Sequence, residues 1–281
     1  MSQRGFYNLL GLIGYPVSHS RSPVMQSAAL SKKRIPAIYV PFSIEPSVIN
    51  HFFKVLPSSN IIGVNVTVPY KEIAYSLCDS HTPIAQALKA VNTIRVVDGK
   101  LIGHNTDVEG FILAIKNKMR IDLNNKKVLL LGAGGSARAI AMGCFQSKVD
   151  TLWIKNRTPS RMMRLLRDMS KYKDKTRLKS VTELHNIYND IDMIINATAL
   201  GLKSDDPLPL PLCGLSKRIK IVDIVYQSAG TTKWVRNAKS SGHQAIDGLE
   251  MLLYQGAASF SFWFPNIAPP LSIMRKALYN N

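Results

Sequence analysis

Apolar residues occur along the chain in two patterns: short runs rich in β-branched residues, and repeats at steps of three or four residues. In the first 105 residues the two patterns alternate, which predicts mixed strands and helices. Ser22 is a candidate N-cap with Pro23 at the first helical position, and Asp98-Gly99 is a typical two-residue hairpin turn. We therefore predict strands at 9–15, 37–42 and 61–68, helices at 22–33 and 76–92, and a hairpin at 93–105.

The second part of the chain has a more regular order of apolar strand, turn and helix. Strands followed by helices in this way predict a parallel sheet that is covered on both faces, so the fold class is α/β. A long amphipathic helix ends the pattern, with Leu249, Leu253 and Phe260 on one face and Asp247 as its cap. The predicted elements are strands at 126–131, 151–158, 192–201 and 219–226, helices at 160–171 and 247–264, and a proline-rich loop at 205–214.

Charge adds one question to this picture, because 36 Lys and Arg against 18 Asp and Glu give a net charge of +18. Such a charge favours anionic partners, including nucleic acid. The basic residues are dispersed, however, with their densest group at 171–179, and no nucleic-acid-binding signature accompanies them. We therefore expect small anionic ligands and no nucleic acid.

The sequence lacks the patterns typical of membrane proteins and of disulfide-rich or metal-binding proteins. No segment approaches the ~20 uncharged apolar residues of a membrane-spanning helix, so no membrane association is expected. Three widely separated cysteines, Cys78, Cys144 and Cys213, follow no metal or redox spacing. They indicate a reduced, cytoplasmic protein without a metal site.

The segment GAGGSA at 132–137 fits the dinucleotide-binding pattern G-x-G-x-x-G/A, and it directly follows an apolar strand and opens a helix. Gly132 would make the tight turn, Gly134 would admit a pyrophosphate, and Ala137 would let the helix pack on the strand. The free N–H groups at the helix N-terminus suit phosphate. The loop residues are Gly132, Ala133, Gly134, Gly135, Ser136 and Ala137.

The next strand predicts which cofactor is used. An NAD-binding chain usually places an acidic residue about twenty residues after the glycine loop. This chain has KNRTPSR instead, with Asn156, Arg157, Thr158 and Arg161 and no acid. Because arginine pairs with a 2′-phosphate that a carboxylate would repel, we predict NADP.

Short polar side chains gather at turns of the first part of the chain. They are the hydroxyl, amide, ammonium and carboxylate groups that suit a small polyhydroxylated acid. Ser22 and Asp107 could equally serve as helix caps. From the residues alone we predict an NADP-dependent oxidoreductase, and its substrate stays undetermined. The candidates are Ser20, Ser22, Thr67, Lys71, Asn92, Asn105 and Asp107.

In combination these motifs resemble the shikimate dehydrogenase family. The resemblance runs in the family's order from GYPVSHSRSP through NVTVPYK, AVNT, GHNTD, GAGGSARA, NRTPSR and INAT to DGLEMLLYQGA, nearly the full chain. It implies two α/β domains: a substrate domain at 1–105, to which 247–281 return, and a Rossmann-type NADP-binding domain at 106–246. It also implies a small-molecule substrate and a monomer or homodimer.

The reaction implied is the reversible, NADP-dependent reduction of 3-dehydroshikimate to shikimate, toward chorismate and the aromatic amino acids. By resemblance Lys71 is the catalytic lysine and Asp107 its partner, and which of them is the acid–base group stays open. The implied substrate contacts are Ser20, Ser22, Thr67, Asn92, Asp107, Tyr226 and Gln255. Thr198, Ile224 and Gly248 join the glycine loop and the 156–161 segment as cofactor positions.

Three alternatives compete with this hypothesis. A quinate/shikimate dehydrogenase has the same fold, but its NAD-using members usually carry the acid that NRTPSR lacks. A methylene-tetrahydrofolate dehydrogenase-like enzyme lacks the NTD and SHSRS sets. A basic nucleic-acid-binding module would need aromatic platforms among clustered basic residues, and the aromatic residues here, 8% of the chain, are scattered.

Overall fold

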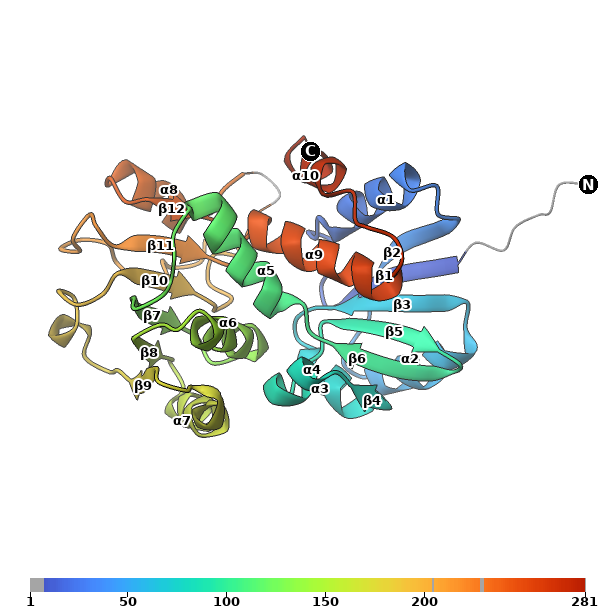
Figure 1. Ribbon diagram of the computed structural model, residues 1–281, viewed down its shortest axis with the longest axis horizontal. Helices are drawn as coiled ribbons and strands as arrows, with labels where there is room; N and C mark the ends of the chain where they lie inside the picture. The colour runs from blue at the N-terminus through green and yellow to red at the C-terminus, as the bar shows by residue number, and fades with distance from the viewer. Residues whose placement is uncertain (1–7, 204, 228–229, 281) are drawn as a thin grey trace, which may run out of the picture. The chain divides into compact units, whose positions relative to one another are not determined.

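The structure, a computed structural model, describes residues 8–203, 205–227 and 230–280. The chain divides into two compact units, each coloured by its position along the chain in Figure 1. The first unit combines Met1–Thr106 with Leu252–Asn281, and the second is Asp107–Met251. The chain returns to the first unit at Leu252, within the first turn of helix α9 (Leu249–Trp263). The sequence-based division placed this return at Asp247.

A mixed β-sheet forms the centre of the first unit. Its strands are β1 (Asn8–Gly14), β2 (Ala37–Ser43), β3 (Ile61–Val66), β4 (Ser80–His81), β5 (Thr93–Val97) and β6 (Lys100–His104), in the order β2-β1-β3-β5-β6-β4. The helices are α1 (Ser22–Lys32), α2 (Ile49–Val55), α3 (Lys71–Leu77), α4 (Pro83–Leu88), α9 and α10 (Leu271–Tyr279). Leu10 and Leu12 of β1 pack against α1, α9 and α10, whereas Ile13 packs against α2 on the other face. The alternation of side chains along a strand thus supplies two cores.

The predicted hairpin is confirmed, because β5 and β6 pair antiparallel through Asp98 and Gly99, whose φ angles are +50° and +71°. The single helix predicted over 76–92 is wrong. Cys78 is extended at the end of α3, β4 follows, and Pro83 opens α4 as a separate helix. Proline lacks a backbone N–H donor and therefore favours a helix start over a helix interior.

The N-cap predicted at Ser22 is also wrong. Arg21 is the N-cap residue of α1 and Ser22 is its first helical residue, while the Ser20 hydroxyl accepts the Ser22 N–H at 3.2 Å. Asp107 is likewise the first residue of helix α5 (Asp107–Ala114). Asp247 lies two residues before α9, and its carboxylate accepts the N–H of Leu249, the first helical residue, at 3.2 Å.

The second unit contains the predicted parallel sheet, in the order β12-β11-β10-β7-β8-β9. Its strands are β7 (Lys127–Leu131), β8 (Thr151–Lys155), β9 (Arg177–Ser180), β10 (Met193–Asn196), β11 (Lys220–Asp223) and β12 (Ala245–Ile246). Its helices are α5, α6 (Gly135–Gln146), α7 (Pro159–Met169) and α8 (Lys233–Ser240). Leu129 and Leu131 pack in one core with Trp234, and Val128 and Leu130, which point the other way, are equally buried. Both faces are covered, as a parallel sheet requires.

The register of this sheet decides where its loops emerge. Leu131 pairs with Lys155 on one side and with Asn196 on the other, and Asn196 pairs with Asp223. These four residues end their strands, so the following loops leave the sheet at one edge. Ligands of open α/β sheets bind at this carboxyl edge.

Candidate functional site

The glycine loop of the second unit has the shape of a phosphate cradle. Gly132 has a φ of +117°, and a Cβ atom there would lie 2.7 Å from the Ala197 carbonyl oxygen, so this position requires glycine. Gly134 is the N-cap residue of α6, and a Cβ atom there would meet no atom of the described part of the chain within 4 Å, apart from its two chain neighbours. The space beside its backbone is open, and the α6 N–H groups point from the helix end. The loop therefore fits a bound pyrophosphate.

The segment after β8 brings two guanidinium groups to the same edge. Thr158 is the N-cap residue of α7, and the Asn156 amide donates to the Thr158 carbonyl at 2.9 Å, which closes the turn. Arg157 is exposed on this turn, and Arg161 is exposed in the first turn of α7. No acidic residue occurs between Asp150 and Asp168, so the turn is free of the carboxylate that would repel a 2′-phosphate.

Asp223, at the end of β11, is a site residue that the sequence reasoning missed. It is fully buried and accepts hydrogen bonds from the Thr232 hydroxyl at 2.7 Å and the Asn196 amide at 2.8 Å. Burial raises the pKa of this carboxyl to about 6, although those hydrogen bonds oppose the shift, and the charge of Asp247 adds to it. An aspartate within IKIVDIVY gave no signal of its own, because its side-chain partners, at the end of β10 and at the start of α8, are distant in sequence.

Two of the predicted cofactor positions, Ile224 and Gly248, are packed together beside the residues that follow Asp223. The Gly248 N–H donates to the Val225 carbonyl at 3.0 Å, and a Cβ atom on Gly248 would lie 2.1 Å from the Ile224 carbonyl oxygen. Tyr226 follows directly and is half-buried. Thr198 closes its own turn, since its N–H and hydroxyl both donate to the Asn196 side-chain oxygen, at 3.0 and 2.6 Å.

In the first unit the structure brings Asn92 and Gln255 together. The Asn92 amide donates to Thr106 Oγ1 at 3.0 Å and to Gln255 Oε1 at 3.4 Å, and Asn92 Oδ1 accepts the Thr106 N–H at 2.9 Å. Ser259, one turn along α9 from Gln255, is buried and hydrogen-bonds to Thr106 Oγ1 at 3.2 Å. The Asn65 amide also donates to Ser259, at 2.9 Å. Asn65, Thr106 and Ser259 were missed because each is an ordinary polar residue until packing brings them together.

Lys71 is the first residue of α3, directly after the buried Tyr70. Its carbonyl oxygen accepts the Val91 N–H at 2.9 Å, which holds the lysine backbone beside the segment that carries Asn92. The Thr67 N–H donates to the Ile13 carbonyl at 2.8 Å, so the start of this turn is held on β1. Asp107 is buried at the start of the second unit, and its pairing with Lys71 stays a prediction.

Ser20 and Ser22 flank the start of α1, Ser22 buried and Ser20 half-buried. His104, a possible proton carrier, is instead a packing residue: its ring stacks on Phe262 at 4.7 Å, its Nδ1 lies 2.8 Å from the Thr82 hydroxyl, and burial lowers its pKa.

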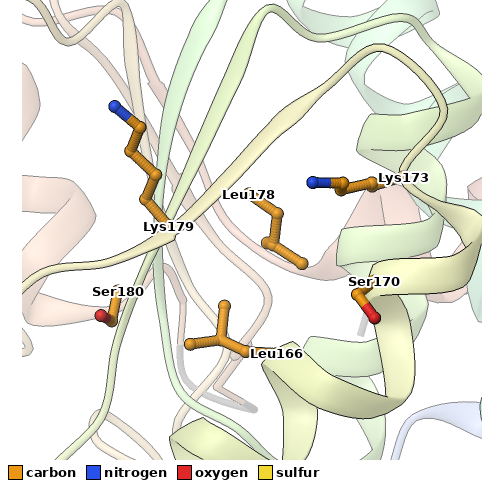
Figure 2. A pocket seen from close by; sticks show the side chains of 6 residues that line it. All are labelled: Leu166, Ser170, Lys173, Leu178, Lys179 and Ser180. Atoms are coloured by element: carbon orange, nitrogen blue, oxygen red, sulfur yellow. The ribbon is translucent and has the colours of Figure 1, made fainter.

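A hollow of about 510 Å³ lies elsewhere in the second unit, between the end of α7 and the edge strand β9 (Figure 2). Its lining contains none of the predicted site residues. Among the described residues no group of three or more His, Cys, Asp or Glu side chains could hold a metal ion, and no described helix has the length and apolar character to cross a membrane. The hollow is lined by Leu166, Ser170, Lys173, Leu178, Lys179 and Ser180.

Comparison with known proteins accounts for most of the chain. Three family profiles match in chain order: the shikimate dehydrogenase substrate binding domain over 12–94, shikimate / quinate 5-dehydrogenase over 113–202, and the shikimate 5'-dehydrogenase C-terminal domain over 248–279. A shikimate dehydrogenase (NADP(+)) of Desulforamulus reducens is 35% identical over 98% of this chain and 96% of its own.

Solved structures match at the level of the fold. Shikimate dehydrogenase from Aquifex aeolicus has a TM-score of 0.89 and 32% identity, covering 97% of this chain and 98% of that one. Shikimate 5-dehydrogenase from Thermus thermophilus, in complex with NADP(H) and shikimate, has a TM-score of 0.85 and 32% identity, covering 97% and 99%.

Proposed function

This chain belongs to the shikimate dehydrogenase family, and from this we propose that it catalyses the reversible, NADP-dependent reduction of 3-dehydroshikimate to shikimate. The reaction is a step toward chorismate and the aromatic amino acids. The observation that carries the proposal is the open glycine loop at the carboxyl edge of the parallel sheet, followed by an acid-free, arginine-bearing turn. Both features suit a nucleotide with a 2′-phosphate.

The proton chemistry falls to Lys71 and Asp107. When bound, NADPH would supply the hydride for the C3 carbon of the substrate, and the C3 oxygen would then have to gain a proton. The Lys71 ammonium donates a hydrogen bond to this oxygen, stabilises its developing negative charge and passes the proton. Asp107 orients the lysine and a neighbouring substrate hydroxyl. In the reverse direction the same groups accept the proton.

The remaining substrate contacts are hydroxyl and amide groups. Two of them are held before any substrate arrives, because Asn92 and Gln255 share hydrogen bonds with each other and with Thr106. Such pre-ordered polar groups lower the entropic cost of orienting a polyhydroxylated ligand. The full set comprises Ser20, Ser22, Thr67, Asn92, Asp107, Tyr226 and Gln255.

A substrate and cofactor panel tests the function as a whole. Initial rates are measured with shikimate and with quinate, each with NADP⁺ and with NAD⁺. Shikimate with NADP⁺ is expected to dominate. Comparable rates with quinate and NAD⁺ would make the chain a quinate/shikimate dehydrogenase of broader use, and no rate with any pair would overturn the proposal.

The role of Lys71 is tested by Lys71→Met, which keeps the apolar stem and removes the ammonium. We expect kcat to fall by about 10²–10⁴-fold, with NADPH affinity and melting temperature unchanged. Lys100→Met, at an exposed lysine of the same unit, is the matched control and should keep the wild-type rate. A Lys71→Met enzyme that retains near-normal turnover would remove this lysine from the chemistry.

We further propose a cytoplasmic protein that acts as a monomer or homodimer on small molecules alone. The three cysteines support a reducing compartment, because Cys78 and Cys144 are buried free thiols and Cys213 is an exposed one. Light scattering would measure the oligomeric state. A steep salt dependence of DNA binding would instead indicate a nucleic-acid partner.

A further inference from the structure

Asp223 accepts hydrogen bonds from the end of β10, from the residues that directly follow β11, and from the N-cap residue of α8. Its Oδ1 accepts the Val225 N–H at 3.1 Å and the Asn196 amide at 2.8 Å, and its Oδ2 accepts the Thr232 hydroxyl at 2.7 Å. The carboxylate is completely shielded from solvent. Burying a carboxylate is costly unless it is paired or hydrogen-bonded, so three convergent donors indicate that this group is retained for a purpose.

The donors lead directly to the proposed nicotinamide end of the site. Val225 lies between Ile224 and Tyr226, and its carbonyl accepts the Gly248 N–H at 3.0 Å. The Ile224 N–H donates to the Asn196 carbonyl at 3.0 Å. Asp223 thus holds the backbone at Ile224 in two ways. It accepts the N–H of Val225, the next residue, and it binds the side chain of Asn196, whose carbonyl accepts the Ile224 N–H.

Asn196 extends the same network to the next loop. Its amide donates to Asp223 and also to the Leu200 carbonyl at 3.0 Å, while its side-chain oxygen accepts both donors of Thr198. The orientation of the Asn196 side chain is therefore set by Asp223 on one side and by Thr198 on the other. One buried carboxylate connects the ends of β10 and β11 and the start of α8.

We propose that Asp223 is a positioning residue for the reaction, which holds Ile224, Tyr226 and Gly248 in the arrangement that receives the nicotinamide ring and the substrate. The inference rests on the proposed function. Asp223 itself is buried behind this backbone and touches neither reactant. Its effect on the reaction passes through the peptide groups of residues 224–226.

Three substitutions separate positioning from stability. Asp223→Ala removes both acceptor oxygens and with them all three hydrogen bonds. Asp223→Asn keeps Oδ1 for Val225 and Asn196 and can donate its amide to the Thr232 hydroxyl, so it is the conservative rescue. Thr232→Val is the matched control, because it removes a hydrogen bond of the same carboxylate on the side away from Ile224.

The readouts are kcat and KM for shikimate and NADP⁺, the NADPH dissociation constant from nicotinamide fluorescence, and the melting temperature. For Asp223→Ala we expect kcat/KM to fall at least tenfold and NADPH to bind at least threefold more weakly. Asp223→Asn and Thr232→Val should stay within threefold of wild type, although Thr232→Val should melt earlier. If the alanine variant does not fold, Asp223→Ser, whose shorter hydroxyl cannot serve three donors, is judged by the same criteria.

Two results would overturn the proposal. One is a folded alanine or serine variant with wild-type kinetics and NADPH affinity. The other is a Thr232→Val enzyme that loses as much activity as Asp223→Ala, because stability would then explain both. A wild-type enzyme that does not oxidise shikimate contradicts the proposed function alone, since the effect of Asp223 on NADPH binding is still measured.

Discussion

The substitution Gly134→Ala tests whether the glycine loop is required for ligand binding or for folding. Apart from its two chain neighbours, no described residue lies within 4 Å of the new Cβ atom, and φ at Gly134 is an ordinary −90°. Alanine is a poorer N-cap residue than glycine by about 0.5–1 kcal/mol, and it gains about 0.4–1 kcal/mol from a stiffer unfolded chain. The free energy of unfolding should therefore change by less than about 0.5 kcal/mol.

The ligand should respond differently to Gly134→Ala. If a pyrophosphate lies against this backbone, the methyl group occupies its space, and overpacking of this kind costs about 1–3 kcal/mol. The NADPH dissociation constant should then rise by roughly 5- to 150-fold. The loop would be weakened as a cofactor site in a protein of unchanged stability.

Gly132→Ala is the matched comparison in the same loop. Here φ is +117° and the added atom would lie 2.7 Å from the Ala197 carbonyl oxygen. Backbone strain of about 1–3 kcal/mol adds to overpacking of similar size, so we expect this variant to melt at least about 5 °C below wild type. Thermal melts without cofactor and fluorescence titrations with NADPH measure the two quantities. A Gly134→Ala protein with wild-type affinity, or one as unstable as Gly132→Ala, would refute the reasoning.

Three further predictions concern charges of the second unit. Arg157→Gln should lower the NADP⁺ over NAD⁺ ratio of kcat/KM by roughly 10- to 100-fold, because charge-assisted hydrogen bonds contribute about 1.5–3 kcal/mol; an unchanged ratio would dissociate Arg157 from the 2′-phosphate. Asp168→Ala should lower the free energy of unfolding in urea by about 3–5 kcal/mol, because it leaves the buried Arg138 guanidinium, 4% exposed and 2.8 Å from Asp168, without its carboxylate partner. Adding Arg138→Met should recover most of this loss. A double variant as unstable as the single one would contradict this. The pKa of Asp223 is raised from 3.8 to about 6, so the native state binds more protons between these values and stability falls as pH rises through 6, by up to about 3 kcal/mol. Denaturation midpoints between pH 4 and 7.5 should show a smaller decline in Asp223→Asn, and an equal decline would contradict the assignment.

The elements predicted most closely from sequence are those whose cause is local. The apolar run before Gly132 and the alanine-rich segment after it determine a strand, a turn and a helix within twenty residues, and the structure has β7 and α6 there. Asp98-Gly99 likewise requires only the two left-handed residues of the turn itself. Where neighbouring residues decide the conformation, pattern is sufficient.

Local pattern failed where two short-range preferences compete. In 76–92 the apolar spacing favours one continuous helix, but Pro83 favours a new start, and Ser80 and His81 instead pair with β6. The pairing partner lies some twenty residues later, so the helical signal could not reveal it. Ser22 does not have its predicted cap role, because the helix begins one residue earlier than the Ser-Pro pattern indicated and Arg21 is its N-cap residue.

Polar networks are further from prediction, because their members are distant in sequence. Asn65 and Ser259 are 194 residues apart and share a hydrogen bond of 2.9 Å. Asp223 collects partners from Asn196 and Thr232, which no periodicity connects. Such residues look like ordinary polar positions until the sheet register brings the strand ends together.

Lys71 shows how evidence from the sequence and evidence from the structure combine. The sequence marks it as a lysine delivered directly after a strand and a proline, which an exposed turn would also explain. In the structure its carbonyl accepts the Val91 N–H, one residue before Asn92, whose amide is held in turn by Thr106. The backbone that carries the ammonium is therefore tied to the backbone of a proposed substrate ligand. A backbone held in this way fixes where the lysine side chain begins, beside a proposed substrate ligand, and such positioning is one condition for efficient proton transfer.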